Sequence, residues 1–150
     1  MTTAGPTQVG AGEGYLPPSD ATTQEWWDAT REHRLLLQHC AGCDRVQWQP
    51  GPVCRGCGRM DALDWRPSAG TGAVDTFTVV HRAPRPDLAT PYVVGRVRLD
   101  DGVVMLATLD LDPATVAIGA PVALGWRDLA DGRALPVFGP ASPPAQEERA

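Results

Sequence analysis

The amino-acid sequence predicts a mainly β protein, in which an N-terminal helix and a small zinc ribbon precede a five-stranded OB-fold barrel. Three observations carry this prediction. Two C-x-x-C pairs lie close together, three short β-like segments surround them, and five further β-like segments follow Pro67. With 150 residues, 43% of them hydrophobic and 21% charged, the chain has the composition of one globular domain, or of a small module and one ordinary domain.

All of the cysteines in the chain belong to the two C-x-x-C pairs, which are Cys40, Cys43, Cys54 and Cys57. Two such pairs at short separation are typical of one tetrahedral metal site, and Zn²⁺ is the expected metal. Gly42, Gly56 and Gly58 are expected where the turns need a positive φ. Because four thiolates leave no open coordination position, the site is expected to be structural. Two disulfides or unrelated thiols are the alternatives, but disulfides belong mainly to secreted proteins.

A short helix is expected over residues 23–33. The segment Thr22-Thr23-Gln24-Glu25 has the form of a capping box, with Thr22 as the N-cap residue. Trp26 and Trp27 place two large apolar rings on this helix. They are expected either to pack on the core of the protein or to dock onto a partner, because tryptophan is enriched at interface hot spots.

Three β-like segments, at residues 34–40, 46–48 and 63–65, alternate with the cysteine pairs. Strand, turn, strand, turn, strand is the order of a zinc ribbon. His33 and His39 lie near the cysteines in sequence. Both are expected to be bystanders, because the four sulfurs already complete a tetrahedral site.

The region after Pro67 predicts a small β-barrel. Its strands are expected at residues 70–80, 92–99, 103–111, 121–128 and 133–138. In the first of them, alternation places Val74, Thr76, Thr78 and Val80 on one face. A short turn or helix is expected from Asp112-Pro113, between the third and fourth strands. An OB-fold fits this pattern, and an SH3-like barrel is the alternative.

No catalytic arrangement is recognisable in the sequence. It contains no G-x-S-x-G elbow, no Walker loop and no G-x-G-x-x-G after a strand. His81 and Arg82, at the end of a strand, would suit an anion, or are simply hydrogen-bonded strand-end residues. Whether the chain has any activity of its own stays open at this point, and none is expected from it alone.

The formal net charge of -5 disfavours nucleic acid as a partner, because such binding requires a basic groove. A nucleic-acid-binding module nevertheless remains an alternative function, and an iron-containing electron carrier is another. The N-terminus lacks the basic and apolar regions of a secretory signal, and no run approaches the roughly 18 apolar residues of a membrane span. A cytoplasmic location, away from membranes, is therefore expected.

Over residues 20–140 the sequence resembles the domain of unknown function 35 (DUF35) family, which combines a rubredoxin-like zinc ribbon with an OB-fold and is associated with acyl-CoA metabolism. Arg55 departs from the proline often found in the second turn, but the ligands are intact. The matching segments are Trp26-Trp27, residues 35–40, Cys43, Gln47-Trp48, Pro50, Pro52, Cys54, Cys57-Gly58, residues 70–72, residues 76–82, residues 91–94, Ile118-Gly119, Pro121-Val122, Leu135-Pro136 and Phe138.

The resemblance implies an accessory, non-catalytic subunit that binds a thiolase-like acyl-CoA enzyme, such as a lipid-transfer-protein-type aldolase, a thiolase or an acyltransferase. The partner would carry the catalytic residues, and this chain would stabilise it and shape its acyl-CoA channel. A heterotetramer with two copies of each subunit is implied. A retro-aldolase or thiolase acting on bulky, steroid-type acyl-CoA is favoured, because the composition suggests a GC-rich genome. The residues expected near the partner or acyl-CoA are Trp26, Trp27, His81, Arg82 and Tyr92.

Five segments are therefore expected along the chain. A flexible arm covers residues 1–18 and the N-terminal helix residues 19–34. The zinc ribbon covers residues 35–67, the OB-fold barrel residues 68–139 and a disordered tail residues 140–150.

Overall fold

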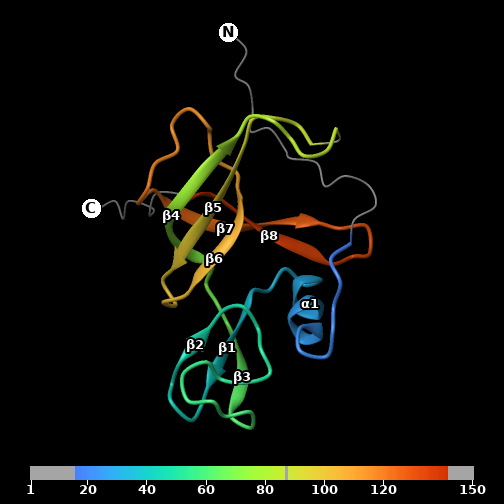
Figure 1. The fold of residues 1–150 in the computed structure, drawn as a ribbon, viewed down its shortest axis with the longest axis vertical. Helices are drawn as coiled ribbons and strands as arrows, with labels where there is room; N and C mark the ends of the chain where they lie inside the picture. Colours follow the sequence, from blue (N-terminus) through green and yellow to red (C-terminus); the bar gives the residue numbers. More distant parts are fainter. Residues whose placement is uncertain (1–15, 87, 142–150) are drawn as a thin grey trace, which may run out of the picture.

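A computed structural model describes residues 16–86 and 88–141 and confirms the expected fold class (Figure 1). The first part holds helix α1 (Gln24–Thr30) and a three-stranded sheet in the order β2-β1-β3, made of β1 (Leu36–Cys40), β2 (Val46–Gln47) and β3 (Leu63–Pro67). The second part is a closed barrel. The arm and tail expected from the sequence fall almost entirely outside the described residues. No helix within the described ranges is long and apolar enough to cross a membrane.

The barrel closes in the strand order β4-β5-β6-β8-β7. Two pairings complete the closure. The start of β4 pairs antiparallel with β7, and the end of β6 pairs parallel with β8, where Leu109 lies opposite Phe138. The five strands are β4 (Thr71–Val80), β5 (Tyr92–Leu99), β6 (Val104–Leu109), β7 (Pro121–Asp128) and β8 (Ala134–Pro140). Closure leaves the barrel without a free edge along its length.

Strand β4 departs from the alternation expected of it. Its register with β5 shifts between Val74 and Thr76, which is a β-bulge at Asp75. Val74 is buried, and after the bulge it is Phe77 and Val79 that pack on the core, while Thr76 and Thr78 are exposed. One inserted residue moves every later side chain to the opposite face of the sheet.

Helix α1 begins one residue later than a capping box would place it, so the assignment of Thr22 as N-cap residue is wrong. The N-cap position is held by Thr23, which makes no side-chain capping bond. The Asp20 side chain instead accepts hydrogen bonds from the backbone N–H of Thr22 at 3.0 Å and of Thr23 at 2.9 Å. The Thr23 hydroxyl also donates to it, and this bond is the largest cause of the lowered pKa of Asp20.

The segment between β6 and β7 forms turns, which is one of the two alternatives expected there, and no helix. In the first turn the N–H of Val116 donates to the Asp112 carbonyl at 2.9 Å. The chain then joins the barrel, because Gly119 N–H donates to the Val74 carbonyl at 2.8 Å. These barrel hydrogen bonds compete with further helical ones.

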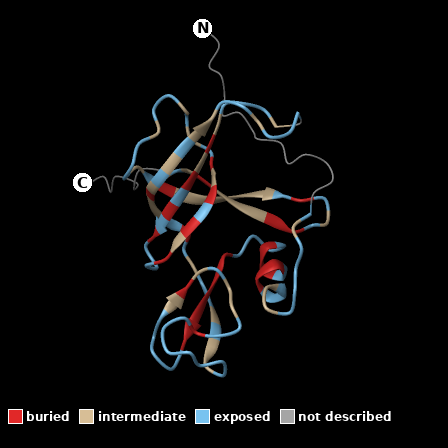
Figure 2. Ribbon diagram, viewed as in Figure 1, coloured by how far each residue is buried: buried red, intermediate tan, exposed pale blue. Residues whose placement is uncertain are grey.

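Helix α1 is fixed to the turn between β7 and β8. The Thr30 hydroxyl donates to the Trp27 carbonyl at 2.7 Å and accepts from the N–H of Ala134 at 3.1 Å. The Arg133 guanidinium lies 4.5 Å from the Trp27 ring centroid, in a cation–π contact. Figure 2 shows the result as buried residues on α1, on β1 and along the barrel strands. One hydrophobic cluster therefore joins α1, β1 and the barrel.

Candidate metal centre

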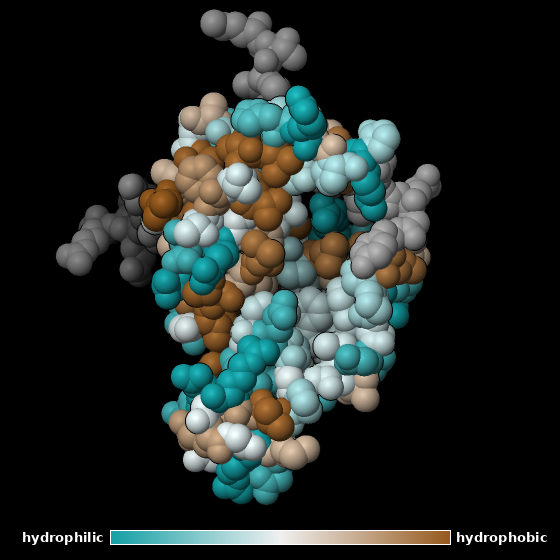
Figure 3. Space-filling model, viewed as in Figure 1, coloured by the Kyte–Doolittle hydropathy of each residue, from teal (hydrophilic) through white to brown (hydrophobic). Residues whose placement is uncertain are grey.

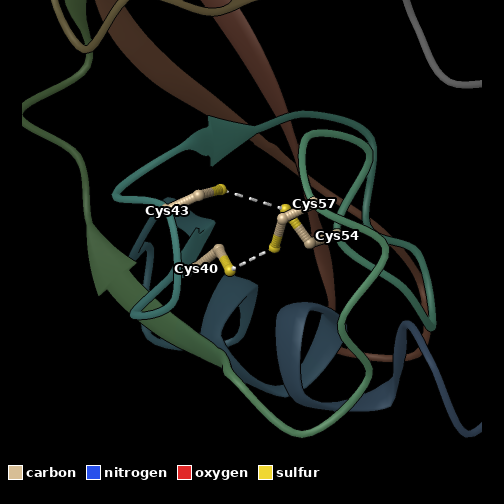
Figure 4. A group of neighbouring side chains, drawn as sticks. All are labelled: Cys40, Cys43, Cys54 and Cys57. Atoms are coloured by element: carbon tan, nitrogen blue, oxygen red, sulfur yellow. Dashed lines mark hydrogen bonds between the residues drawn. The ribbon is translucent and has the colours of Figure 1, made fainter.

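The four cysteine sulfurs converge on one point between the two turns (Figure 4). All four Sγ atoms lie within 4.8 Å of one another, and the Cys40–Cys57 and Cys43–Cys54 pairs are each 3.6 Å apart. Tetrahedral coordination with Zn–S distances of about 2.3 Å would place the sulfurs about 3.8 Å apart. The sulfur positions therefore fit the expected zinc site, and neither pair is at disulfide distance, which is about 2.05 Å.

The two turns that carry the cysteines have the same backbone pattern. Cys40 N–H donates to the Arg45 carbonyl and Cys54 N–H donates to the Arg59 carbonyl, each at 2.8 Å. The carbonyls of the same cysteines accept from the residues four positions later, Asp44 at 2.7 Å and Gly58 at 2.9 Å. This matched pair of turns presents two sulfurs from each side of the site.

Of the three turn glycines, Gly58 has the positive φ that the sequence suggested, whereas Gly42 and Gly56 serve a different need. Positive φ occurs at the equivalent positions Asp44, at 60°, and Gly58, at 75°. At Gly42 a Cβ would lie 2.9 Å from the Arg59 Cδ, and at Gly56 it would lie 3.0 Å from the Arg45 Cδ. Each of these two glycines therefore makes room for the arginine of the opposite turn.

The thiols of the cluster are not equivalent. Backbone N–H groups of Cys57 and Gly56 lower the pKa of Cys54 to about 6. The backbone N–H of Arg45 lowers the pKa of Cys43. The adjacent Cys54 sulfur, burial and the other two cysteines together outweigh this effect and raise the pKa of Cys43 to about 12. The backbone N–H groups of the second turn therefore stabilise negative charge on the Cys54 sulfur. A bound dication favours thiolates at all four positions.

His39 lies beside the cluster, outside the ligand set, as expected. It is 3% exposed, its Nδ1 is 3.0 Å from Asp64 Oδ1 and its Nε2 is 2.6 Å from Asp44 Oδ1. Hydrogen bonds to both carboxylates require both ring nitrogens to donate. The hydrogen bond from His39 is the first cause of the lowered pKa of Asp44. His39 thus ties the first turn to β3.

Two buried glutamines, which the sequence analysis overlooked, support the second turn. Gln47 donates to the Gln38 side-chain oxygen at 2.9 Å and accepts from the N–H of Arg55 at 3.0 Å. Gln38 in turn accepts from Gly51 N–H at 2.8 Å and donates to the Gly51 carbonyl at 3.1 Å. Polar residues at sheet positions flanked by apolar residues were the available signal, since buried amides must find partners.

The other residues named from the sequence fall in two separate regions. Trp26 and Trp27 are 5% and 8% exposed and belong to the hydrophobic cluster. His81 and Arg82 are exposed at the end of β4, and Tyr92 is half-buried at the start of β5. The loop between these strands projects at the end of the barrel away from the ribbon (Figure 1). The metal cluster, the tryptophans and this loop therefore do not form one site.

His33 also lies away from the cysteines. Its ring stacks on Trp126 with centroids 5.5 Å apart, and its Nε2 is 2.6 Å from Asp128 Oδ1.

The fold also has a pocket of about 540 Å³ between α1, the ribbon and the outer face of the barrel. Trp26 and Trp27 line it together with Trp48, although the sequence pattern gave no sign of a cavity.

In the comparison with known proteins, both the ribbon and most of the barrel match models of protein families. Residues 27–61 match the model "ChsH2, rubredoxin-like zinc ribbon domain", and residues 65–127 match "ChsH2, C-terminal OB-fold domain". The solved Ltp2-ChsH2(DUF35) aldolase contains a chain with 37% identity and a TM-score of 0.77, and the match covers 85% of this chain and all of that chain.

Two curated relatives carry the same region within longer proteins. A probable enoyl-CoA hydratase alpha subunit of Thermomonospora curvata is 40% identical over 124 residues, and the match covers 82% of this chain and 38% of the relative. The 3-oxo-4,17-pregnadiene-20-carboxyl-CoA hydratase alpha subunit of Mycobacterium tuberculosis is 37% identical over 123 residues, with 77% and 37% covered. The chain thus spans less than two fifths of the length of these relatives. With its zinc ribbon and OB-fold both matched, the chain belongs to the DUF35 family, in the form found in ChsH2.

Proposed function

We propose that the chain is a non-catalytic accessory subunit of an acyl-CoA enzyme and that it binds a thiolase-like aldolase or thiolase chain. One observation carries the proposal, which is the match to the DUF35 chain of the Ltp2-ChsH2 aldolase along the whole length of that chain. In the proposed complex the partner carries the catalytic residues, and this chain stabilises it and shapes the acyl-CoA channel.

The metal in this proposal is a structural Zn²⁺ held by the four cysteines. Four protein thiolates complete a tetrahedral site and leave no position for a substrate. The ion would hold together two turns whose own side chains are mostly exposed. A colourless protein with one zinc per chain supports this assignment, whereas iron gives visible absorption and would favour an electron carrier.

The proposed substrate class is a bulky, steroid-type acyl-CoA, handled by the partner as a retro-aldolase or thiolase. The name of the Mycobacterium tuberculosis relative refers to a steroid carboxyl-CoA, which supports this class. The proposed assembly is a heterotetramer with two copies of each subunit, and its proposed location is the cytoplasm.

The test is co-expression of the chain with the protein most similar to Ltp2 in the source organism. Co-purification at a one-to-one ratio, a mass near that of two copies of each subunit, and aldolase or thiolase activity only with the partner present are expected. A partner that is equally stable and active without this chain would overturn the accessory role.

Nucleic-acid binding is the weaker alternative. The relatives carry names of acyl-CoA hydratase subunits, and the net charge of -5 opposes phosphate backbones. Salt-dependent binding of oligonucleotides, measured by fluorescence anisotropy, would bring this alternative forward.

A further inference from the structure

The pocket beside α1 has walls from three parts of the fold. Trp26 and Trp27 come from α1, and Trp48 comes from the ribbon, with its ring centroid 5.2 Å from that of Trp26. The outer face of the barrel supplies the opposite wall, including Leu106 of β6 and Arg127 of β7. Aromatic and aliphatic walls at the junction of structural units are typical of binding sites.

The rim of the pocket is exposed and apolar. Leu106 is 68% exposed, although it is a large hydrophobic residue on a regular strand. It lies opposite Arg96 on β5, on the face of β6 that points away from the barrel core. Figure 3 shows hydrophobic side chains gathered in a band over the barrel on one face. A pocket that opens onto an exposed apolar rim resembles the centre of a protein interface more than an enclosed ligand cavity.

One cationic group lies in the wall of this mostly apolar pocket, whose other polar lining residues, Thr23, Gln49 and Thr108, are neutral. Arg127 is partly buried there, and burial lowers the pKa of its guanidinium. Its strand neighbour across the β7–β8 pair is Leu135, which also lines the pocket. A carboxylate brought close to a partly buried guanidinium favours its charged form and is held by charge-assisted hydrogen bonds. Charge complementarity therefore selects an acidic group as the polar neighbour of an apolar occupant.

We propose that this pocket, with Leu106 at its rim and Arg127 in its wall, is the docking socket for the thiolase-like partner subunit, which inserts an apolar side chain flanked by a carboxylate. This inference rests on the proposed function and adds the location and chemistry of the contact. It also changes the role of the two helix tryptophans. The sequence left core packing and direct docking onto a partner as alternatives, whereas in this proposal the buried tryptophans form walls of the pocket that receives the partner.

The test compares two glutamate variants in association with the co-expressed aldolase chain, measured by isothermal titration. Leu106→Glu places a charge at the rim of the pocket, and Ile118→Glu is the matched control, because Ile118 is 69% exposed and does not line the pocket. We expect Leu106→Glu to weaken association at least tenfold and Ile118→Glu to change it less than twofold. Equal affinity of the two variants would overturn the socket.

Two further measurements test the carboxylate contact and whether the partner fills the pocket. Arg127→Met is expected to weaken association and to reduce its dependence on salt concentration, and an unchanged salt dependence would contradict the carboxylate contact. The fluorescent probe 8-anilinonaphthalene-1-sulfonate is expected to bind the free chain and to be released on complex formation. Full retention of the probe in the complex would show that the partner leaves the pocket open.

Metal content and thermal unfolding of each variant, measured first, must equal those of the unmodified chain. If the unmodified chain forms no complex with the aldolase chain, the proposed function itself fails. If the complex forms but tolerates Leu106→Glu, only the socket fails.

Discussion

The ribbon and the barrel reach stability by different means. In the barrel, side chains such as Val97, Met105 and Phe138 are fully buried, and no barrel strand contributes a buried polar side chain among the described residues. In the ribbon, strands β1 and β2 bury Gln38, His39 and Gln47, each with hydrogen-bond partners. The turns beyond these strands are largely exposed and meet at the four sulfurs.

The difference shows how chain length limits the choice of stabilising interaction. A segment as short as the ribbon cannot enclose a hydrophobic core of its own, so metal coordination and buried polar contacts take its place. The barrel closes on itself and encloses apolar side chains from all of its strands. Four perturbations distinguish stabilisation by metal and polar contacts in the ribbon from stabilisation by the hydrophobic core of the barrel, starting with the largest expected effect.

Metal removal should affect the ribbon and spare the barrel. Apparent zinc-binding free energies of about 10–16 kcal/mol are typical of sites that fold on binding. We expect Cys54→Ser, or chelation, to abolish metal binding, to disorder residues near the two turns and to end partner binding. Amide hydrogen exchange should show lost protection in β1–β3 and retained protection in β4–β8. A fully protected ribbon without metal would contradict the structural role of the ion.

A cavity in the barrel should destabilise the barrel and leave the metal site of the ribbon intact. Phe138→Ala removes a fully buried ring from the barrel core, and such changes cost about 3–5 kcal/mol. The midpoint of denaturant unfolding should fall accordingly, while zinc content stays at one per chain until the barrel unfolds. Loss of zinc from the folded Phe138→Ala variant would mean that the ribbon depends on the barrel.

The glutamine pair provides an intermediate effect confined to the ribbon. Gln47→Leu removes the acceptor of the Arg55 N–H, at about 1–3 kcal/mol for a buried unsatisfied group, and one of the two donors to the Gln38 oxygen. Zinc affinity, measured by competition with a chelator, should fall about 10–100-fold, as for lost supporting contacts around a metal. The exposed control Gln49→Leu lacks these two bonds and should leave zinc affinity unchanged.

The smallest expected effect separates the two helix tryptophans. Trp26 Nε1 is buried without a hydrogen-bond partner among the described residues, so Trp26→Phe loses packing but no hydrogen bond. Trp27→Phe also weakens the contact with Arg133, which is worth about 0.5–1 kcal/mol. Thermal unfolding should therefore show Trp27→Phe as the less stable variant. Equal melting temperatures would show that the cation–π contact does not help to hold α1 in place.

Much of this architecture could be predicted because the signals were local. The cysteine spacing indicated the metal cluster, and short apolar runs between turn residues indicated the strands near their observed positions. The errors arose where a contact that the pattern does not encode decides the structure, whether it comes from a near neighbour or from a distant strand. Asp20 accepts the bonds expected of the predicted capping threonine, and a bulge reverses the later half of β4.

The sequence by itself determined which atoms could hold a metal, because C-x-x-C spacing constrains four sulfurs through short stretches of backbone. It also determined that the region after Pro67 forms strands, because alternation and turn residues act within a few positions. Only the tertiary structure decided that Trp26 and Trp27 are buried and that they wall a pocket with Leu106 and Arg127. Those residues are about 80–100 positions apart in the chain, and local periodicity carries no information on which distant surfaces meet.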